Sequence, residues 1–347
     1  SPPLLQADHR MVTPRVVSGL APSPHPGSSQ FGARSATIEY ATPMRLDRRA
    51  RPRDSPRRNP MTAWTLGRVL AWAAKDFAGR GLDTPRLDAE ILLAHALGLR
   101  RLDLYLRHEQ PLTDAELATL RGLVARRRQR EPVAYIVGRR DFYGRSFAVD
   151  PRVLVPRPET EGLVELALKA LPDDLAAPTA ADLCTGSGCV AVTLAAERPS
   201  LSVDAVDLSA DALAVARGNA DALGVGARVA TWEGDLWAPL AGRRFHLVTA
   251  NPPYIPSPEL DGLMADVRDF EPRMALDGGP DGTALLGRLL ADARAHLLPG
   301  ATIVVELHWD QGPAAVALAQ AAGLVDAEAT RDWSGHTRYL RARAPAD

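Results

Sequence analysis

The sequence "TAADLCTGSGCVAVTLA", residues 179–195, is the stretch that decides the fold. It begins as a short apolar run, turns through Gly186 and Gly188, and continues as an apolar segment of helical length. Glycines let a backbone approach a ligand closely, and the first turn of a helix offers N–H groups without partners. No Gly-Lys-Ser/Thr sequence follows, so this is not a Walker loop, and the third glycine of the usual dinucleotide fingerprint is absent. We interpret the stretch as a strand, a candidate ligand-binding turn and a helix.

Apolar strand-like segments alternate with helix-like segments on the C-terminal side of residue 155. This alternation predicts an α/β fold with a parallel sheet covered by helices on both faces. The predicted strands are 179–184, 202–207, 228–232, 245–250 and 301–307, with late strands at 325–331 and 336–342 that close one edge. The predicted helices are 159–170, 188–197, 209–222, 283–297 and 312–322.

Residues 61–131 have the pattern of a small helical bundle. A helix over 62–79 is predicted by apolar residues at a period near 3.6, Trp64 and Phe77 among them. A second helix follows Thr84-Pro85 and ends at Gly98, and a third follows a capping box that begins at Thr113. The run "RRRQR", residues 126–130, is either favourable charge at a helix C-terminus or a docking patch for an acidic or phosphate-bearing partner.

Residues 132–155 alternate apolar and polar side chains around Gly138 and Gly144, which predicts a β-hairpin linker. It joins the bundle to a ligand-binding domain over 156–347.

The first 60 residues differ from the rest of the chain. They contain ten proline and ten arginine residues but four acidic ones, so they carry +6 and leave −7 for residues 61–347 out of a total of −1. Such a segment buries too little surface to offset its ordering entropy, so we predict disorder. Three interpretations stay open: an extension upstream of a start at Met61, a targeting peptide, or a basic arm for nucleic acid.

The composition narrows the class of protein. A chain of 347 residues is expected to form about two domains, and no run of 18 apolar residues predicts a membrane span. The two cysteines, Cys184 and Cys189, form no disulfide framework, which favours a reducing cytoplasm. The eight histidines have no ligand spacing, so we expect no metal.

Two acidic positions lie at the ends of the second and third predicted strands. Asp207 follows Gly188 by 19 residues and can accept hydrogen bonds from ribose hydroxyls; alternatively, Asp207 or Ser209 caps the next helix. "DLW", residues 235–237, ends the third strand and can border an adenine ring, although Leu236 and Trp237 fit core packing equally well.

The fourth strand runs into Asn251-Pro252-Pro253-Tyr254. Two prolines cannot continue a sheet ladder, because each lacks a backbone N–H. The four residues are therefore either a simple turn or a rigid grip for a planar –NH2 group.

Together these residues resemble the S-adenosylmethionine-dependent class I methyltransferases, and the Asn-Pro-Pro-Tyr sequence narrows the resemblance to the amino-methylating branch. Over residues 61–342 the chain is similar to the peptide chain release factor N5-glutamine methyltransferases, the PrmC or HemK family. The sequences that carry this resemblance are "EPVAYIVGRRDFYG" (131–144), "VPRPETEGLVE" (155–165), "NPPYI" (251–255) and "RDWSGH" (331–336).

The resemblance implies a Rossmann-like seven-stranded domain and a helical N-terminal domain that helps to seat the substrate. It implies methylation of the glutamine in a Gly-Gly-Gln motif of class I release factors, with S-adenosylmethionine as cofactor. The implied cofactor contacts are Cys184, Thr185, Gly186, Ser187, Gly188, Asp207, Leu236 and Asn251. The implied substrate contacts are Asn251, Pro252, Pro253 and Tyr254, of which Asn251, Pro252 and Tyr254 are catalytic. Cys184 and His308 depart from the family, which usually has glycine at both positions.

An alternative is a nucleic-acid amino-methyltransferase of the N6-adenine type, which would use the same grip on an exocyclic amine. Residues 61–347 are net negative and the chain is 5% aromatic, whereas base flipping requires a basic, aromatic groove. A third alternative, a nucleic-acid binder on an inactive methyltransferase fold, is opposed by Asn251 and Asp207. We therefore expect no direct nucleic-acid partner.

Overall fold

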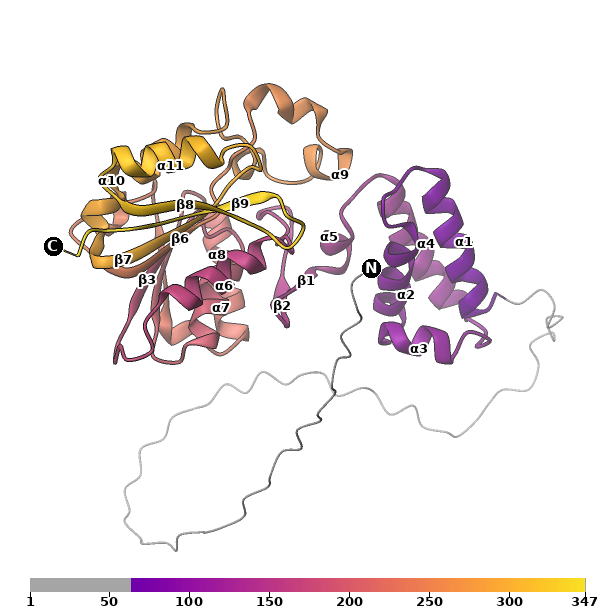
Figure 1. Cartoon of the computed structure of the whole chain (residues 1–347). Helices are drawn as coiled ribbons and strands as arrows, with labels where there is room; N and C mark the ends of the chain where they lie inside the picture. Colours follow the sequence, from indigo (N-terminus) through magenta and orange to yellow (C-terminus); the bar gives the residue numbers. More distant parts are fainter. Residues whose placement is uncertain (1–63, 347) are drawn as a thin grey trace, which may run out of the picture. The chain divides into compact units, whose positions relative to one another are not determined.

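A computed structural model describes residues 64–346 (Figure 1). The predicted Arg/Pro-rich extension, residues 1–60, lies outside the described residues. The first helix of the bundle begins at Leu66, and the bundle packs around one apolar cluster that includes Leu66, Phe77, Leu92 and Leu120. Its helices are α1 (Leu66–Gly79), α2 (Pro85–Leu97), α3 (Arg101–Leu106), α4 (Asp114–Arg128) and α5 (Val133–Val137).

The start of the first helix differs from the prediction. α1 begins at Leu66, because the Thr65 side chain accepts a hydrogen bond from the Arg68 N–H and so acts as the N-cap. Trp64, which we assigned to the helix, precedes it and is 40% exposed. The other two predicted helix starts are confirmed: Pro85 is the first residue of α2, and Thr113 and Glu116 form the capping box of α4.

The predicted hairpin over 132–155 is too long. Strands β1 (Arg139–Phe142) and β2 (Arg145–Ala148) pair antiparallel, which confirms the hairpin itself, but Val133–Val137 form the helix α5. This single turn begins after Pro132 and ends at Gly138 in the left-handed conformation. Tyr135 is buried there, and its hydroxyl donates to the Val153 carbonyl at 2.5 Å. Burial of consecutive apolar residues, which an alternating pattern does not reveal, favours the helix.

The described residues form a seven-stranded sheet in the order β5-β4-β3-β6-β7-β9-β8. β9 runs antiparallel to β7 and β8, and the pairs among β3 to β7 are parallel. The strands are β3 (Thr179–Leu183), β4 (Ser202–Asp207), β5 (Val229–Glu233), β6 (Phe245–Ala250), β7 (Leu297–Glu306), β8 (Val325–Arg331) and β9 (Thr337–Arg343). The predicted strands are confirmed, except that β7 begins four residues earlier than expected.

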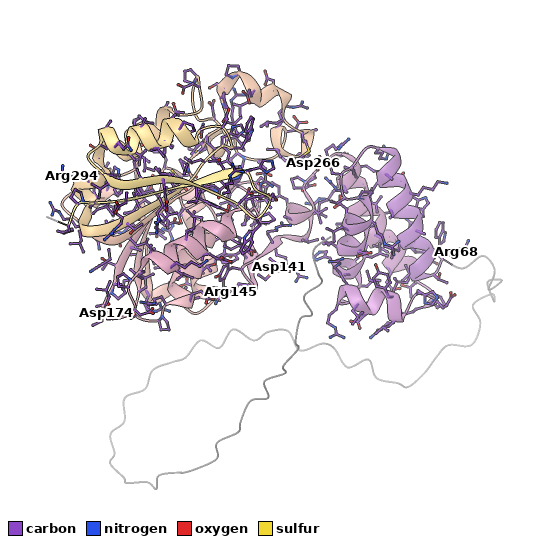
Figure 2. All side chains as sticks on the ribbon, viewed as in Figure 1. Arg68, Asp141, Arg145, Asp174, Asp266 and Arg294 are labelled. Carbon is purple, nitrogen blue, oxygen red and sulfur yellow. The ribbon has the colours of Figure 1, made fainter. Side chains whose placement is uncertain are left out.

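Helices cover both faces of this sheet, as the alternation predicted (Figure 1). Successive residues of β3 point to opposite sides: Ala180 belongs to the apolar cluster with α6 and α7, and Ala181 to the cluster with α10 and α11. The helices are α6 (Thr160–Ala170), α7 (Cys189–Glu197), α8 (Ala210–Ala222), α10 (Ala284–His296) and α11 (Gly312–Ala321). The hairpin is tied to α7 by Arg145, which is labelled in Figure 2 and pairs with Glu197 at 2.6 Å.

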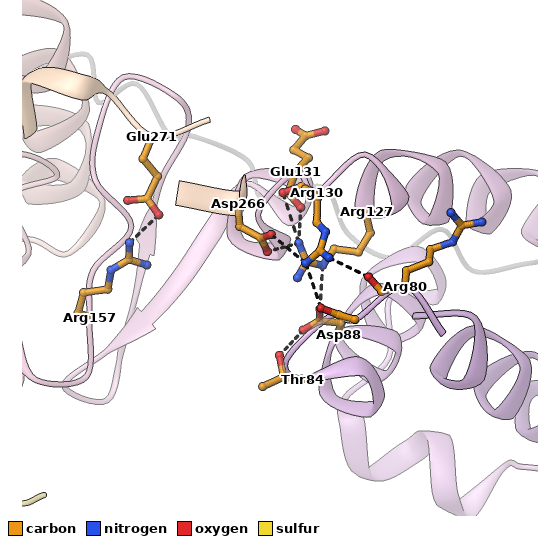
Figure 3. Close-up of polar contacts among 10 residues, drawn as sticks. Arg80, Thr84, Asp88, Arg127, Arg130, Glu131, Arg157, Asp266 and Glu271 are labelled. Carbon is orange, nitrogen blue, oxygen red and sulfur yellow. Dashed lines mark hydrogen bonds and ion pairs between the residues drawn. The ribbon is translucent and has the colours of Figure 1, made fainter. Parts of the chain in front are cut away.

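Residues 251–283, between β6 and α10, contain no long helix or strand, and none was predicted there; the three short helices in this segment were not predicted either. These helices are η4 (Ser257–Gly262), α9 (Ala265–Arg268) and η5 (Arg273–Ala275). The buried Arg127 at the end of α4 donates to Asp88 at 2.7 Å and to Asp266 of α9 at 2.6 Å (Figure 3). This contact joins the helical bundle to the segment that follows Asn251-Pro252-Pro253-Tyr254, which we call the acceptor motif.

The arginine run at the end of α4 is used within the chain. Arg126 donates to Glu131 at 2.7 Å, Arg128 pairs with Asp76 at 2.8 Å, and Arg130 donates to the Arg80 carbonyl at 2.8 Å. With Arg127 engaged as well, the run is a set of internal contacts rather than an open docking patch. Within residues 64–346, none of the helices is both long and apolar enough to cross a bilayer.

Candidate active site

A cavity of about 220 Å³ opens at the carboxyl ends of β3, β4, β5 and β6. This is the edge at which ligands bind in open parallel sheets, because the loops after the strands converge there. A cavity of this size suits a small molecule rather than a folded domain. Predicted residues that line it are Cys184, Thr185, Gly186, Ser187, Asp207, Leu236, Asn251 and Pro253.

The turn between β3 and α7 is held by a buried acid. Asp182 accepts hydrogen bonds from the Thr185 hydroxyl at 2.6 Å and from the Thr249 hydroxyl at 2.7 Å. Burial raises the pKa of Asp182 to about 6, against the opposing effect of these two donors. Asp182 also lines the cavity. Asp182 is the first residue of the Asp-x-x-x-Gly-x-Gly sequence that contains both turn glycines. Its position in that sequence marks it as a candidate site residue, although it is not among the predicted ones.

The three positive φ angles in this turn have different consequences. Gly186 (φ +54°) faces open space, so an added Cβ would meet no protein atom within 4 Å. Gly188 (φ +76°) is not among the described residues that line the cavity; an added Cβ would lie 3.0 Å from the Ala216 Cβ. Gly188 therefore serves close packing of α7 against α8. Cys184 (φ +57°) also adopts the left-handed conformation, which explains why glycine suits this position.

Asp207 connects the first two strands of the site. One carboxylate oxygen accepts from the Gly186 N–H at 2.8 Å and the other from the Ser209 N–H at 2.9 Å. Ser209 is the N-cap of α8, since its side chain accepts from the Ala212 N–H at 3.1 Å. Burial raises the pKa of Asp207, and the backbone donors oppose that rise. A carboxylate offers about four lone pairs, so Asp207 can still accept from a ligand beyond its backbone donors.

The two apolar residues that follow the third strand, Leu236 and Trp237, have different surroundings. Leu236 lines the cavity, whereas Trp237 packs in the core, stacked on His296 with ring centroids 4.5 Å apart. The Trp237 indole N–H donates to the Leu289 carbonyl at 2.9 Å. Core packing therefore accounts for Trp237, and Asp235 lies at the cavity beside Leu236.

The acceptor motif contributes Asn251 and Pro253 to the cavity, while Pro252 and Tyr254 are not among its lining residues in the described part of the chain. Asn251 Nδ2 donates to the Thr160 hydroxyl oxygen at 3.3 Å. The Tyr254 hydroxyl donates to the buried Glu306 at 3.4 Å, and the Tyr254 carbonyl accepts from Gln311 at 3.1 Å. Stacking of Tyr254 on a substrate amide stays a prediction.

His308, the second departure from the family, lies beside this motif. Its ring is tilted against Tyr254 with centroids 6.0 Å apart, and its Nδ1 lies 2.6 Å from Asp310 Oδ1. It therefore packs against the acceptor loop without entering the cavity that the described residues form.

Arg157 was not among the predicted site residues. It lines the cavity and donates to Glu271 at 2.6 Å (Figure 3). Burial raises the pKa of Glu271, and the positive charge of Arg157 opposes that rise. Arg157 and Thr160 lie within the "VPRPETEGLVE" sequence that carries the family resemblance, but that sequence does not reveal their contacts with the site, and Glu306 lies in none of the quoted sequences.

The chemistry of these side chains fits S-adenosylmethionine. The Asp207 carboxylate can accept from ribose hydroxyls, and the apolar side chains of Leu208, Leu236 and Leu285 supply the surface that a heteroaromatic ring requires. Gly186 leaves open space that a Cβ would occupy.

Known protein families match both the helical bundle and the sheet domain of this chain. Residues 68–138 match the PrmC N-terminal domain, and residues 163–263 match the methyltransferase small domain. The release factor glutamine methyltransferase of Geobacter sulfurreducens is 42% identical over 81% of this chain and 97% of its own. That of Bordetella pertussis is 46% identical over 73% of this chain and 93% of its own.

Among solved structures, the release factor-specific protein-(glutamine-N5) methyltransferase of Alicyclobacillus acidocaldarius is 28% identical. It covers 57% of this chain and 99% of its own, with a TM-score of 0.36. Membership therefore rests on the sequence relatives, whose identity and coverage leave one conclusion: the chain belongs to the release factor glutamine methyltransferase family of S-adenosylmethionine-dependent enzymes.

Proposed function

We propose that this protein transfers a methyl group from S-adenosylmethionine to the side-chain amide nitrogen of the glutamine in the Gly-Gly-Gln motif of peptide chain release factors. One observation supports this most strongly. Asn251 uses its Nδ2 on Thr160, so its Oδ1 is the group left to accept a hydrogen bond at the cavity. A primary amide donates hydrogen bonds through its –NH2 group, so a hydrogen-bond acceptor beside the Gly186 turn can hold it next to the cofactor.

The reaction poses a problem of alignment. An amide nitrogen is a poor nucleophile because its lone pair is delocalised into the carbonyl group. S-adenosylmethionine supplies an electrophilic methyl group on a sulfonium, so a nitrogen–carbon bond forms as the sulfur–carbon bond breaks. Holding the nitrogen in line with that methyl carbon at about 3–3.5 Å contributes several kcal/mol through proximity alone.

The residues of the acceptor motif divide this task. Asn251 Oδ1 and the Pro252 carbonyl each accept one N–H of the substrate amide, which orients the nitrogen and favours localisation of its lone pair. Tyr254 stacks on the planar amide, and the two prolines keep the loop stiff, so less entropy is lost on binding. The nitrogen becomes acidic once it is alkylated, and its proton then passes to solvent without a dedicated base.

The parts of the chain take different roles in this proposal. The helical region, residues 61–131, docks the folded release factor, the hairpin region 132–155 links the two domains, and residues 156–347 bind the cofactor and catalyse transfer. Because the substrate takes part in translation, we place the enzyme in the cytoplasm.

A methyl-transfer assay tests the proposal. Purified enzyme with radiolabelled S-adenosylmethionine is offered a release factor, duplex DNA or ribosomal RNA in parallel reactions. We expect label on the release factor only, and a strong loss of label with the Asn251→Ala variant. Label on DNA or RNA instead would establish the nucleic-acid alternative.

A further inference from the structure

Glu306 is a buried carboxyl group to which the mechanism above assigns no task. It is the last residue of β7 and is 1% exposed. Its Oε1 accepts from the Tyr254 hydroxyl at 3.4 Å, and its Oε2 is buried without a hydrogen-bond partner among residues 64–346. An unsatisfied buried oxygen is costly, so its retention calls for a function.

Thr160 connects this carboxyl to the acceptor motif. It is the first residue of α6 and is 2% exposed. Its hydroxyl oxygen accepts from Asn251 Nδ2 at 3.3 Å, and its hydroxyl group also stabilises the charged form of Glu306. A carboxylate accepts hydrogen bonds only, so the single hydrogen of the Thr160 hydroxyl is available to the unpartnered Oε2 of Glu306.

We propose that Thr160 and Glu306 are positioning residues that fix the orientation of the Asn251 side-chain amide, so that Nδ2 faces Thr160 and Oδ1 faces the cavity. With the hydrogen of Thr160 directed at the carboxylate, the hydroxyl oxygen is left as an acceptor, and Asn251 must present Nδ2 to it. Oδ1 then faces the cavity, where an acceptor amide needs it. The same carboxylate holds the Tyr254 hydroxyl, so one buried charge orients both ends of the motif. This inference rests on the proposed function.

Protonation of Glu306 would reverse this arrangement. A neutral carboxyl group can donate to Thr160, and Thr160 can then donate to Asn251 Oδ1, which turns Nδ2 toward the substrate and removes the acceptor. Burial raises the pKa of Glu306 to about 7, although Thr160 and the positive charge of Arg338 on β9 oppose the rise. Glu159 and the hydroxyl groups of Tyr254 and Tyr339 also face this carboxyl.

The test compares Thr160→Val, which removes the hydroxyl at nearly constant volume, with Thr160→Ser, which keeps it. Thr193→Val is the matched control, because Thr193 is a buried threonine on α7 whose hydroxyl makes no hydrogen bond within residues 64–346. We expect Thr160→Val to lower kcat about tenfold at unchanged cofactor Kd, and Thr160→Ser to restore most of it. Thr193→Val should keep the wild-type kcat.

The pH profile gives a readout that a merely structural role would not move. Wild-type kcat should rise between about pH 6 and about pH 8 as Glu306 loses its proton, and Glu306→Gln should abolish that rise. If Thr160→Val keeps the wild-type kcat, or if Glu306→Gln keeps the wild-type profile, the positioning role is wrong. A wild-type enzyme that transfers no label to a release factor would instead contradict the proposed function.

Discussion

The cofactor half of the cavity is built largely from neighbouring residues, whereas the acceptor half is assembled from distant parts of the chain. Asp182 and Thr185 are three residues apart, and Asp207 and Ser209 are two apart. By contrast, Asn251 is held by Thr160 across 91 residues, and Tyr254 by Glu306 across 52. Two hydrogen bonds of the cofactor half join residues that are further apart in the chain: the Gly186 N–H donates to Asp207 across 21 residues, and the Thr249 hydroxyl donates to Asp182 across 67.

This difference separates the two functions of the site. The strand–turn–helix unit provides a binding surface for one small molecule, and changes in it should alter cofactor affinity. The acceptor motif is held by distant residues in the orientation that positions the substrate amide, so changes in the motif should alter kcat. A turn variant that changes mainly kcat, or an acceptor-motif variant that changes mainly cofactor affinity, would contradict this separation.

The largest effect is expected for Asn251→Ala. The contact that is lost strengthens as the substrate nitrogen leaves the plane of its amide, so it belongs mainly to the transition state. By analogy with the removal of one preorganised group, kcat should fall about 100- to 1,000-fold while cofactor Kd changes little. Steady-state kinetics and calorimetric titration measure the two values. Asn251→Asp keeps an acceptor oxygen and should fall between the wild type and Ala; equal loss in both variants would refute hydrogen-bond acceptance.

Asp207→Ala tests the cofactor half. Two hydrogen bonds to a charged acceptor are lost, along with the contact that anchors the Gly186 N–H. Cofactor affinity should weaken by about 3 kcal/mol, roughly 100-fold, as measured by calorimetry. Asp211→Ala, in the first turn of α8, is a control that should retain wild-type affinity. Unchanged affinity in Asp207→Ala would remove this residue from the cofactor site.

Asp182 gives the cofactor half a pH dependence of its own. Its folded-state pKa, raised from 3.8 to about 6, lies above the unfolded value, so its stabilising contribution is present at low pH and is lost as pH rises through about 6. Asn does not titrate. The stability of Asp182→Asn relative to wild type should therefore increase by about 2–3 kcal/mol from about pH 4 to about pH 7. Urea unfolding without cofactor measures it; a constant difference across that range would contradict the raised pKa.

The smallest effects distinguish the two glycines of the turn. Gly188→Ala combines a left-handed backbone with a 3.0 Å contact to Ala216, so it should lose about 1–2 kcal/mol of stability. Gly186→Ala carries the backbone strain alone, but its Cβ enters the cavity side of the turn. It should therefore keep more stability and lose more cofactor affinity than Gly188→Ala. The reverse order in unfolding and binding measurements would show that Gly188 rather than Gly186 contacts the ligand.

The same division explains what the sequence could predict. Gly186, Asp207 and the strand and helix boundaries around them follow from local periodicity and turn chemistry. Trp237 could not be assigned, because core packing and ring contact require the same apolar residue, and only the stacked His296 decides between them. Thr160 lies in a sequence that carries the family resemblance, but its contact with Asn251, like that of Glu306 with Tyr254, joins residues too far apart in the chain for local spacing to predict. The helix over 133–137 was missed because its five residues are too few to show a helical period.

The central claim is that the side-chain amide of the Gly-Gly-Gln glutamine is the group that accepts the methyl. Tandem mass spectrometry of a release factor after reaction with wild-type enzyme tests it most directly, with a release factor whose Gly-Gly-Gln glutamine is replaced by alanine as the paired substrate. We predict one added methyl group on the side-chain nitrogen of that glutamine and none on the alanine variant. Methylation at another residue, or equal methylation of both substrates, would contradict the account.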